Sequence, residues 1–160
     1  MAFTVSQLNV YPVKGLKGIA VESSAATERG LAHDRRFVVV DGAGRFLSQR
    51  ELPLMATVWT DIAGGELRLA APDHDEVAVP LEPAGGDPLV ATVWDSECDA
   101  IAPSPEADRW LSEVLGRHCA SQLGEEVGEL FVDGEGEGVE LVRAIERHRG
   151  DAARDLATEA

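Results

Sequence analysis

The sequence predicts a mainly β fold: an antiparallel β-barrel of short strands, capped by a short C-terminal α-helix and followed by an acidic, partly helical tail. Short apolar or alternating segments recur through the first hundred residues, and turn residues separate them. Near residue 104 the apolar spacing changes to that of a helix, and after residue 123 acids and glycines dominate. Closing the strands into a barrel would leave no exposed strand edges.

The expected strands follow one another at short intervals. The apolar run at residues 37–40, the turn Asp41-Gly42-Ala43-Gly44 and residues 45–48 form a strand–turn–strand pattern that is typical of a hairpin. Six or more short strands favour one closed or nearly closed sheet. The other strands are expected at residues 3–10, 19–21, 56–62, 66–70, 77–81 and 89–94.

The capping helix is expected to begin after Ser104. Serine is a favoured N-cap, Pro105 suits the first helical position, and acids in the first turn complement the helix dipole. Gly116 is expected to end the helix. Its apolar face consists of Trp110, Leu111, Val114 and Leu115.

The sequence divides into a barrel domain at residues 1–118 and an acidic, Gly/Glu-rich tail at residues 119–160. Residues 124–138 hold six acids and five glycines, and such a stretch buries too little apolar surface to fold, so a loop is expected. Helical spacing then returns, which predicts a weak, solvated helix. The residues with this spacing are Val139, Leu141, Val142 and Ile145.

The charge of the chain is distributed unevenly. Its 160 residues carry a formal net charge of −15, which argues against binding to nucleic acid. Residues 1–50, however, hold seven of the 14 Lys and Arg residues but only four of the 29 acids, which indicates a local anion site. No apolar run approaches the ~18 residues of a membrane helix, so we expect no membrane insertion and a cytoplasmic location.

Cys98 and Cys119 are the two cysteines of the chain. Neither lies in a Cys-x-x-Cys pair or a Cys/His cluster, so we expect two unpaired thiols and no metal site. The sequence also lacks a Ser-His-Asp, Walker or dinucleotide-binding pattern. The residues by themselves therefore indicate no catalytic group.

One stretch of the sequence has the chemistry to bind an anion. In Tyr11-Pro12-Val13-Lys14-Gly15-Leu16-Lys17-Gly18 a strand ends in a loop, where Lys14 supplies charge and glycines let backbone N–H groups approach a ligand. Further along, Arg35 or Arg36 at the start of a strand could hold a phosphate with its planar guanidinium. On the residues alone, ordinary solvated cations remain an open alternative.

A series of short motifs between about Leu8 and Arg117 occurs in a fixed order. These motifs are Tyr11-Pro12-Val13-Lys14-Gly15, Glu28-Arg29-Gly30-Leu31, Asp34-Arg35-Arg36-Phe37, Val40-Asp41, Gly44-Arg45-Phe46-Leu47, Gln49-Arg50-Glu51, Val93-Trp94-Asp95 and Trp110-Leu111-Ser112. Together they resemble the N-terminal β-barrel domain that precedes a MOSC domain, the C-terminal module of molybdenum-cofactor sulfurases. The two domains occur together in amidoxime-reducing proteins, in related bacterial reductases and in the cofactor sulfurase.

The resemblance implies a cofactor site. It places Lys14, Gly15 and Arg35 against the phosphate of the molybdenum cofactor (molybdopterin), although the family has a serine where this chain has Gly15. In the family, a cysteine of the MOSC domain ligates molybdenum, and neither Cys98 nor Cys119 lies in such a context. No MOSC-like sequence follows residue 119, so we expect a MOSC-domain protein or another redox partner to supply the metal-ligating half.

Three functional hypotheses follow. The first is an accessory lobe of a MOSC-type molybdenum-cofactor protein, which binds the cofactor phosphate, pairs with a MOSC domain supplied in trans and has no complete catalytic site alone. The second is a stand-alone protein-interaction barrel that never binds the cofactor. The third is a truncated or frame-shifted remnant of a MOSC-containing oxidoreductase. Whether the chain takes part in an enzyme stays open at this point, because a fold does not fix an activity.

Overall fold

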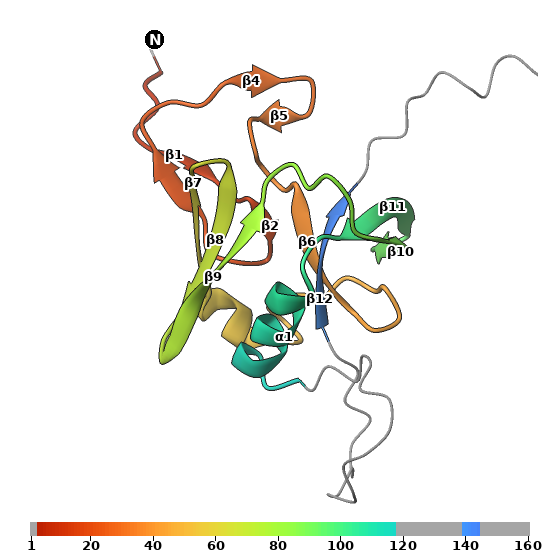
Figure 1. Ribbon diagram of the computed structural model, residues 1–160. Coiled ribbons are helices and arrows are strands. Elements are labelled where there is room, and N and C mark those ends of the chain that lie inside the picture. Colours follow the sequence, from red (N-terminus) through yellow and green to blue (C-terminus); the bar gives the residue numbers. More distant parts are fainter. Residues whose placement is uncertain (1–2, 118–138, 145–160) are drawn as a thin grey trace, which may run out of the picture.

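The computed structural model describes residues 3–117 and 139–144, which form short strands around one α-helix (Figure 1). The elements in chain order are β1 (Leu8–Val10), β2 (Val13–Lys14), β3 (Ile19–Val21), β4 (Ala26–Thr27), β5 (Gly30–Leu31), β6 (Phe37–Asp41), the 3-10 helix η1 (Pro53–Thr57), β7 (Trp59–Ala63), β8 (Glu66–Ala71), β9 (His74–Pro80), β10 (Asp87–Val93), β11 (Ser96–Ala102), α1 (Pro105–Val114) and β12 (Val139–Ala144).

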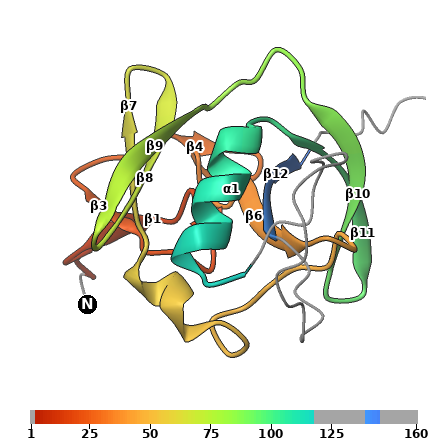
Figure 2. The ribbon, with the colours of Figure 1, turned by 60° about the horizontal axis from the view of Figure 1, so that its bottom comes forward.

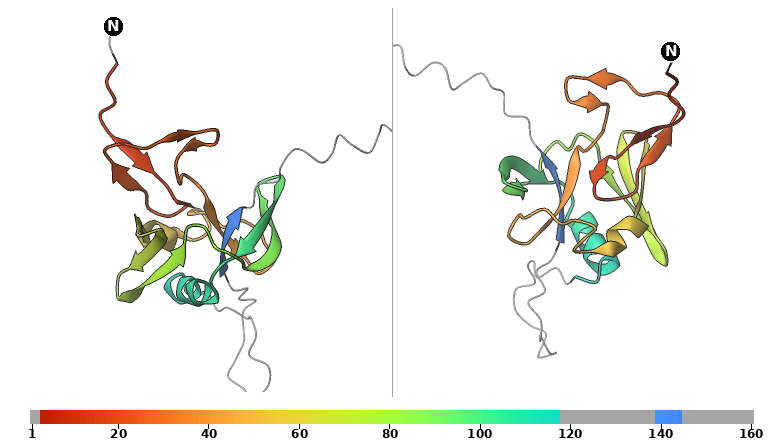
Figure 3. Two further views of the ribbon diagram at one scale, coloured as in Figure 1. Left: turned by 45° about the horizontal axis from the view of Figure 1, so that its top comes forward. Right: turned by 180° about the vertical axis from the view of Figure 1, so that it is seen from behind.

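In the described residues the strands form four sheets. The largest has the order β10-β11-β12-β6-β2, and a second has the order β7-β8-β9. The small pairs β1-β3 and β4-β5 complete the set, and Figures 1 and 3 show β1, β4 and β5 at the end of the molecule opposite α1. Within the described part no sheet closes on itself, so the mainly β class is confirmed while the predicted closed barrel is not.

Strand β6 forms the centre of the molecule. All five of its residues are buried, because both faces of the strand are covered. Phe37 and Val39 contribute to the main core, whereas Val38 and Val40 belong to a second cluster with residues of β10, β11 and β12. On one side β6 pairs antiparallel with β12, and on the other it pairs parallel with β2, with Val13 opposite Phe37.

Helix α1 covers the main core at one end of the molecule. Figure 2 shows α1 between the sheet β7-β8-β9 and the strands β6 and β12. Ser104 caps the helix as predicted, since its hydroxyl accepts a hydrogen bond from the backbone N–H of Ala107 at 3.2 Å. Trp110, Leu111 and Leu115 of the predicted apolar face are buried in the core.

Hydrogen bonds join α1 to β12. The carboxylate of Asp108 is buried, and its Oδ1 accepts the backbone N–H of Leu141 at 2.9 Å. The hydroxyl oxygen of Ser112 accepts the backbone N–H of Val139 in a longer contact of 3.5 Å. These contacts fix β12 in the sheet from the helix side, where the side chains of Val139 and Leu141 are buried in the main core.

The prediction of a helix at the end of the chain was wrong for residues 139–144, which form strand β12. This strand fits between β6 and β11 because Val139 and Leu141 belong to the main core while Val142 belongs to the second cluster. A strand buried on both faces has no polar alternation, so its apolar spacing imitates a short helix. The predicted tail helix is therefore corrected to a central strand, and residues 118–138 and 145–160, with Ile145 and the predicted loop, lie outside the described residues.

Smaller differences also concern the strands. Pro53 begins the 3-10 helix η1, so the strand expected at residues 56–62 starts only at Trp59. Strand β11 was not predicted, although it pairs with β10 along its whole length. Neither helix in the described part of the chain is long and apolar enough to cross a membrane.

Candidate functional site

The short strand β2 positions Lys14. Val13 is fully buried in the main core, and because neighbouring side chains of a strand point to opposite faces, Lys14 lies on the other side of the sheet. There its Nζ lies 4.3 Å from the centre of the Phe46 ring and 5.5 Å from that of Trp94. Both distances are within the range of a cation–π interaction.

Gly15 shapes the loop that follows β2. Its φ of +88° is in the left-handed region, and a Cβ at this position would lie 2.9 Å from the Cε of buried Met55. The serine of the family would be strained in this backbone conformation and crowded by Met55. The loop is also held from outside, because the Gln49 side chain donates a hydrogen bond to the Gly15 carbonyl oxygen at 2.8 Å.

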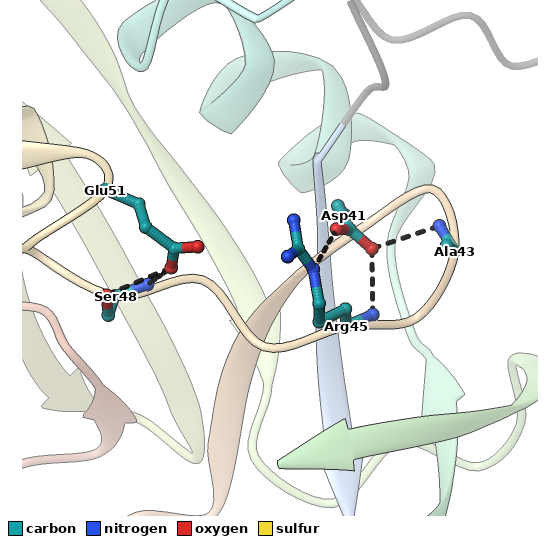
Figure 4. A network of polar contacts seen from close by, with 5 residues as sticks. All are labelled: Asp41, Ala43, Arg45, Ser48 and Glu51. Carbon is teal, nitrogen blue, oxygen red and sulfur yellow. Dashed lines mark hydrogen bonds and ion pairs between the residues drawn. The ribbon is translucent and has the colours of Figure 1, made fainter. Parts of the chain in front are cut away.

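The segment between β6 and η1 brings Phe46 and Arg50 to the same place, and Figure 4 shows the polar contacts that fasten it. The buried carboxylate of Asp41 accepts hydrogen bonds from the backbone N–H groups of Ala43 and Arg45, at 3.1 and 2.8 Å, and from the Arg45 Nε at 3.0 Å. Further along the segment, the Glu51 carboxylate accepts hydrogen bonds from the backbone N–H and the hydroxyl of Ser48, at 3.1 and 3.0 Å.

Arg35 lies beside this site and is held by its neighbours. Its backbone N–H donates to the Tyr11 carbonyl oxygen at 2.7 Å, and its φ is +49°. The guanidinium pairs with the Asp34 carboxylate at 2.6 Å and lies 5.8 Å from the centre of the Tyr11 ring. Asp34 in turn accepts the backbone N–H of Tyr11 at 2.9 Å. Arg35 therefore contacts Tyr11, and its guanidinium is paired with Asp34.

These segments enclose an open cleft of about 360 Å³. Arg35 does not line it, whereas Lys14, Gly15 and Arg50 do. No lining residue is acidic, and neither Lys14 nor Arg50 forms an ion pair within residues 3–117 and 139–144. In a chain of net charge −15 this cleft is a local positive site. Its lining residues are Tyr11, Lys14, Gly15, Leu16, Phe46, Ser48, Gln49, Arg50 and Trp94.

The pKa of Lys14 reflects this environment. Partial burial lowers it from the ordinary value of a lysine, and the nearby positive charge of Arg35 lowers it further. Both causes disfavour the charged ammonium in the free protein. An anion bound beside Lys14 would offset both of them, because it replaces lost solvation and screens Arg35.

The donors of the cleft fit the phosphate of a cofactor and not its metal. Lys14 and Arg50 are suitable partners for a phosphate, and the loop at Gly15 lines the cleft beside them. In the described residues no three His, Cys, Asp or Glu side chains gather where they could hold a metal ion. Cys98, on β11, has a pKa raised by burial and then by the charge of Asp99, and a raised pKa disfavours the thiolate that binds metals. Cys119 lies outside the described residues.

Several residues of the cleft were not predicted as site residues. The expected set was Lys14, Gly15 and Arg35, and the structure adds the side chains of Phe46, Arg50 and Trp94. Among these, Trp94 is 67% exposed. A tryptophan at the end of an expected strand, directly before Asp95, was the signal for it, since turns usually contain small polar residues or glycine.

Comparisons with known proteins agree with the fold and with the sequence motifs. The family model of the MOSC N-terminal beta barrel domain matches residues 2–118. The mitochondrial amidoxime-reducing component 1 of Xenopus laevis is 29% identical over 113 residues, which are 68% of this chain and 33% of the relative. The molybdenum cofactor sulfurase of Anopheles gambiae is 31% identical over 121 residues, which are 69% of this chain and 16% of the relative.

A solved structure shows the same fold. It is the solution structure of a protein from Bordetella bronchiseptica, with a TM-score of 0.51 and 18% identity, and the match covers 78% of this chain and 90% of that protein. The matches to the curated relatives, by contrast, span about a third of their length or less. Since the family model covers most of the chain and confirms the family expected from its motifs, the protein belongs to the MOSC N-terminal beta barrel domain family.

Proposed function

We propose that this chain is the lobe of a MOSC-type molybdenum-cofactor protein that binds the phosphate of the cofactor. Lys14 and the backbone at Gly15 contact the phosphate, and Arg35 contributes its charge from beside Tyr11. The single observation that carries the proposal is the cleft itself, in which two cations without ion-pair partners among the described residues face solvent in an otherwise acidic protein.

The arrangement of the cations supports a phosphate rather than a nucleic acid or an extended acidic partner. The cleft of about 360 Å³ is local. Carboxylates flank it, because Asp34 accepts the backbone N–H of the lining residue Tyr11 and Glu51 accepts that of the lining residue Ser48. Lys14 and Arg50 give the cleft its positive charge. The pKa of Lys14 is lowered by burial and then by the charge of Arg35. A compact dianion satisfies such a pair of cations at short range, whereas a long polyanion needs a track of them.

The chain's own residues would bind and orient the cofactor without taking part in redox chemistry. Lys14 holds the phosphate end, and the aromatic rings of Tyr11, Phe46 and Trp94 shield it from water on the protein side. The bound molybdenum would supply the redox chemistry, with its ligands provided by a MOSC domain. We propose that this MOSC domain packs over the cleft, where the exposed rings of Tyr11 and Trp94 offer apolar surface.

The test is cofactor retention in a complex. The full chain is mixed with a separately produced MOSC domain loaded with molybdopterin, and the bound pterin is quantified after gel filtration. The Lys14→Ala/Arg35→Ala variant is expected to retain at least about tenfold less pterin, because the charge-assisted hydrogen bond from Lys14 and the neighbouring positive charge of Arg35 are both lost. Isothermal titration of the lobe alone with inorganic phosphate measures the same contacts without a partner.

The matched control is Lys17→Ala. Lys17 comes from the same loop, but its Nζ lies 4.6 Å from the centre of the Trp59 ring and the residue does not line the cleft. This variant is expected to retain pterin and to bind phosphate as the unsubstituted protein does. Equal retention by the double variant and by Lys17→Ala would refute the proposal.

A further inference from the structure

The turn between β10 and β11 holds an unusual residue. Trp94 follows β10 directly, and its φ of +57° lies in the left-handed region, which glycine and asparagine occupy easily and bulky residues avoid. Despite this backbone cost, its indole is 67% exposed and so contributes little to the core. Strained backbone at bulky residues concentrates at functional sites, because folding alone would not favour it.

The surroundings of the indole are those of a binding site. Trp94 contacts the edge of Phe46, with 5.6 Å between the ring centres and 60° between the ring planes, and the Nζ of Lys14 is 5.5 Å from the centre of the indole ring. Phe46 itself is buried, and the turn before it is held by the Asp41 carboxylate, which accepts the backbone N–H of Arg45. One side of the indole is thus supported by a fixed ring while most of its surface stays open.

Trp94 also lies where two clefts meet. Next to the cleft of Lys14 is a second one of about 340 Å³, and the two share Phe46, Ser48, Arg50 and Trp94. The second cleft adds Arg45, Glu51 and Thr92 to the lining, and the Glu51 carboxylate already accepts hydrogen bonds from Ser48. The second cleft therefore extends the site beyond Lys14, and two aromatic rings, those of Phe46 and Trp94, and two arginines are among its lining residues.

We infer that Trp94 is a stacking platform for a planar heterocycle that is joined to the phosphate held at Lys14. The inference rests on the proposed function and adds to it the residue that binds the ring of the ligand, a phosphate ester that carries a flat, bicyclic ring system, as both pterins and purine nucleotides do. An aromatic face binds such rings through stacking, and a guanidinium next to it adds a cation–π contact. Arg50 lines both clefts together with Trp94, so its guanidinium is available to a ring bound there.

The experiment compares ligands with and without a ring on the full chain. Guanosine monophosphate and ribose 5-phosphate carry the same phosphate, so the ratio of their dissociation constants isolates the ring. Titration calorimetry and quenching of tryptophan fluorescence are expected to show guanosine monophosphate binding about tenfold tighter. Pterin-6-carboxylate, which has a pterin ring and one anionic group, replaces guanosine monophosphate in a parallel arm and shows which ring source is preferred.

Trp94→Asn is the decisive variant. Asparagine suits the left-handed turn, so the melting temperature is expected to stay at or near that of the unsubstituted protein. The variant is expected to bind guanosine monophosphate and ribose 5-phosphate with about equal affinity, because the ring no longer has an aromatic face to stack on. Trp94→Phe keeps a ring and is expected to restore much of the preference. Trp59→Asn is the control, because Trp59 is another exposed tryptophan with a lysine over its ring and lies outside both clefts.

The outcomes separate this inference from the proposed function. If Lys14→Ala weakens both phosphate esters while Trp94→Asn leaves the ring preference intact, the platform is refuted and the phosphate site stands. If the unsubstituted protein binds both esters equally, the platform is refuted as well. If Lys14→Ala changes neither affinity, the phosphate site fails, and the platform for its ligand fails with it.

Discussion

At the scale of single residues, the site depends on a cation in an unfavourable place. Lys14 is partly buried, lies against Phe46 and Trp94, and has Arg35 near enough to lower its pKa. Since the pKa in the fold lies below the unfolded value, protonation of Lys14 opposes folding, and this contribution disappears as the pH rises above the unfolded value. A bound anion acts in the opposite direction and raises the pKa. Binding of an anion and protonation of Lys14 are therefore coupled.

This coupling predicts a pH profile, best measured with sulfate because that ion does not titrate in the range. The affinity for sulfate is expected to fall as the pH rises, with a midpoint below the ~10.4 of an ordinary lysine. Lys14→Arg should remove the decline, because a guanidinium stays protonated there. Calorimetric titrations between about pH 7 and pH 11, a range that spans the titration of a lysine, provide the measurement. A profile that is the same in both proteins would show that Lys14 is not the group responsible.

At the scale of secondary-structure elements, the sequence predicted those elements whose start and end signals lie within the element itself. Helix α1 was predictable because Ser104, Pro105 and Gly116 mark its ends. Strand β12 was misread because its partners β6 and β11 are distant in the chain, and only their contact covers both of its faces. The cleft was half predictable: Lys14 and Gly15 share a motif, whereas Trp94 is brought to them by the backbone hydrogen bonds of Thr92 with Gly44 and Phe46, which are distant in the chain.

The contact between α1 and β12 predicts a stability effect. Asp108→Ala leaves the buried N–H of Leu141 without its acceptor, which should lower the free energy of unfolding by about 2–3 kcal/mol. Glu113→Ala, at an exposed position of the same helix, serves as the control and should change it by less than ~0.5 kcal/mol. Urea denaturation followed by circular dichroism measures both. Equal effects of the two substitutions would contradict the role given to Asp108.

At the scale of the whole molecule, the family model and the folded unit differ in extent. The model of the family ends at residue 118, yet the central sheet includes β12 from residues 139–144. Val139, Leu141 and Val142 are fully buried, and burial of each such side chain contributes roughly 1.5–3 kcal/mol. Their sum is comparable with the ~5–15 kcal/mol by which a domain is usually stable.

A truncation series tests this integration of β12. A chain that ends at residue 117 is expected to lose cooperative thermal unfolding, since the edges of β6 and β11 and their apolar side chains become exposed. A chain that ends at residue 144 keeps every described strand and should unfold cooperatively. Differential scanning calorimetry distinguishes the two. A cooperative transition at an unchanged temperature in the shorter chain would show that β12 is dispensable.

The central claim is that an acidic protein concentrates its anion binding in the cleft at Lys14. The most direct measurement is a titration of the isotopically labelled full chain with inorganic phosphate, followed in two-dimensional 1H–15N NMR spectra. The account predicts that shifts concentrate at the backbone amides of Lys14, Gly15 and Arg50 and at the indole N–H of Trp94. Unchanged signals at these four positions, with phosphate-dependent shifts elsewhere or nowhere, would contradict it.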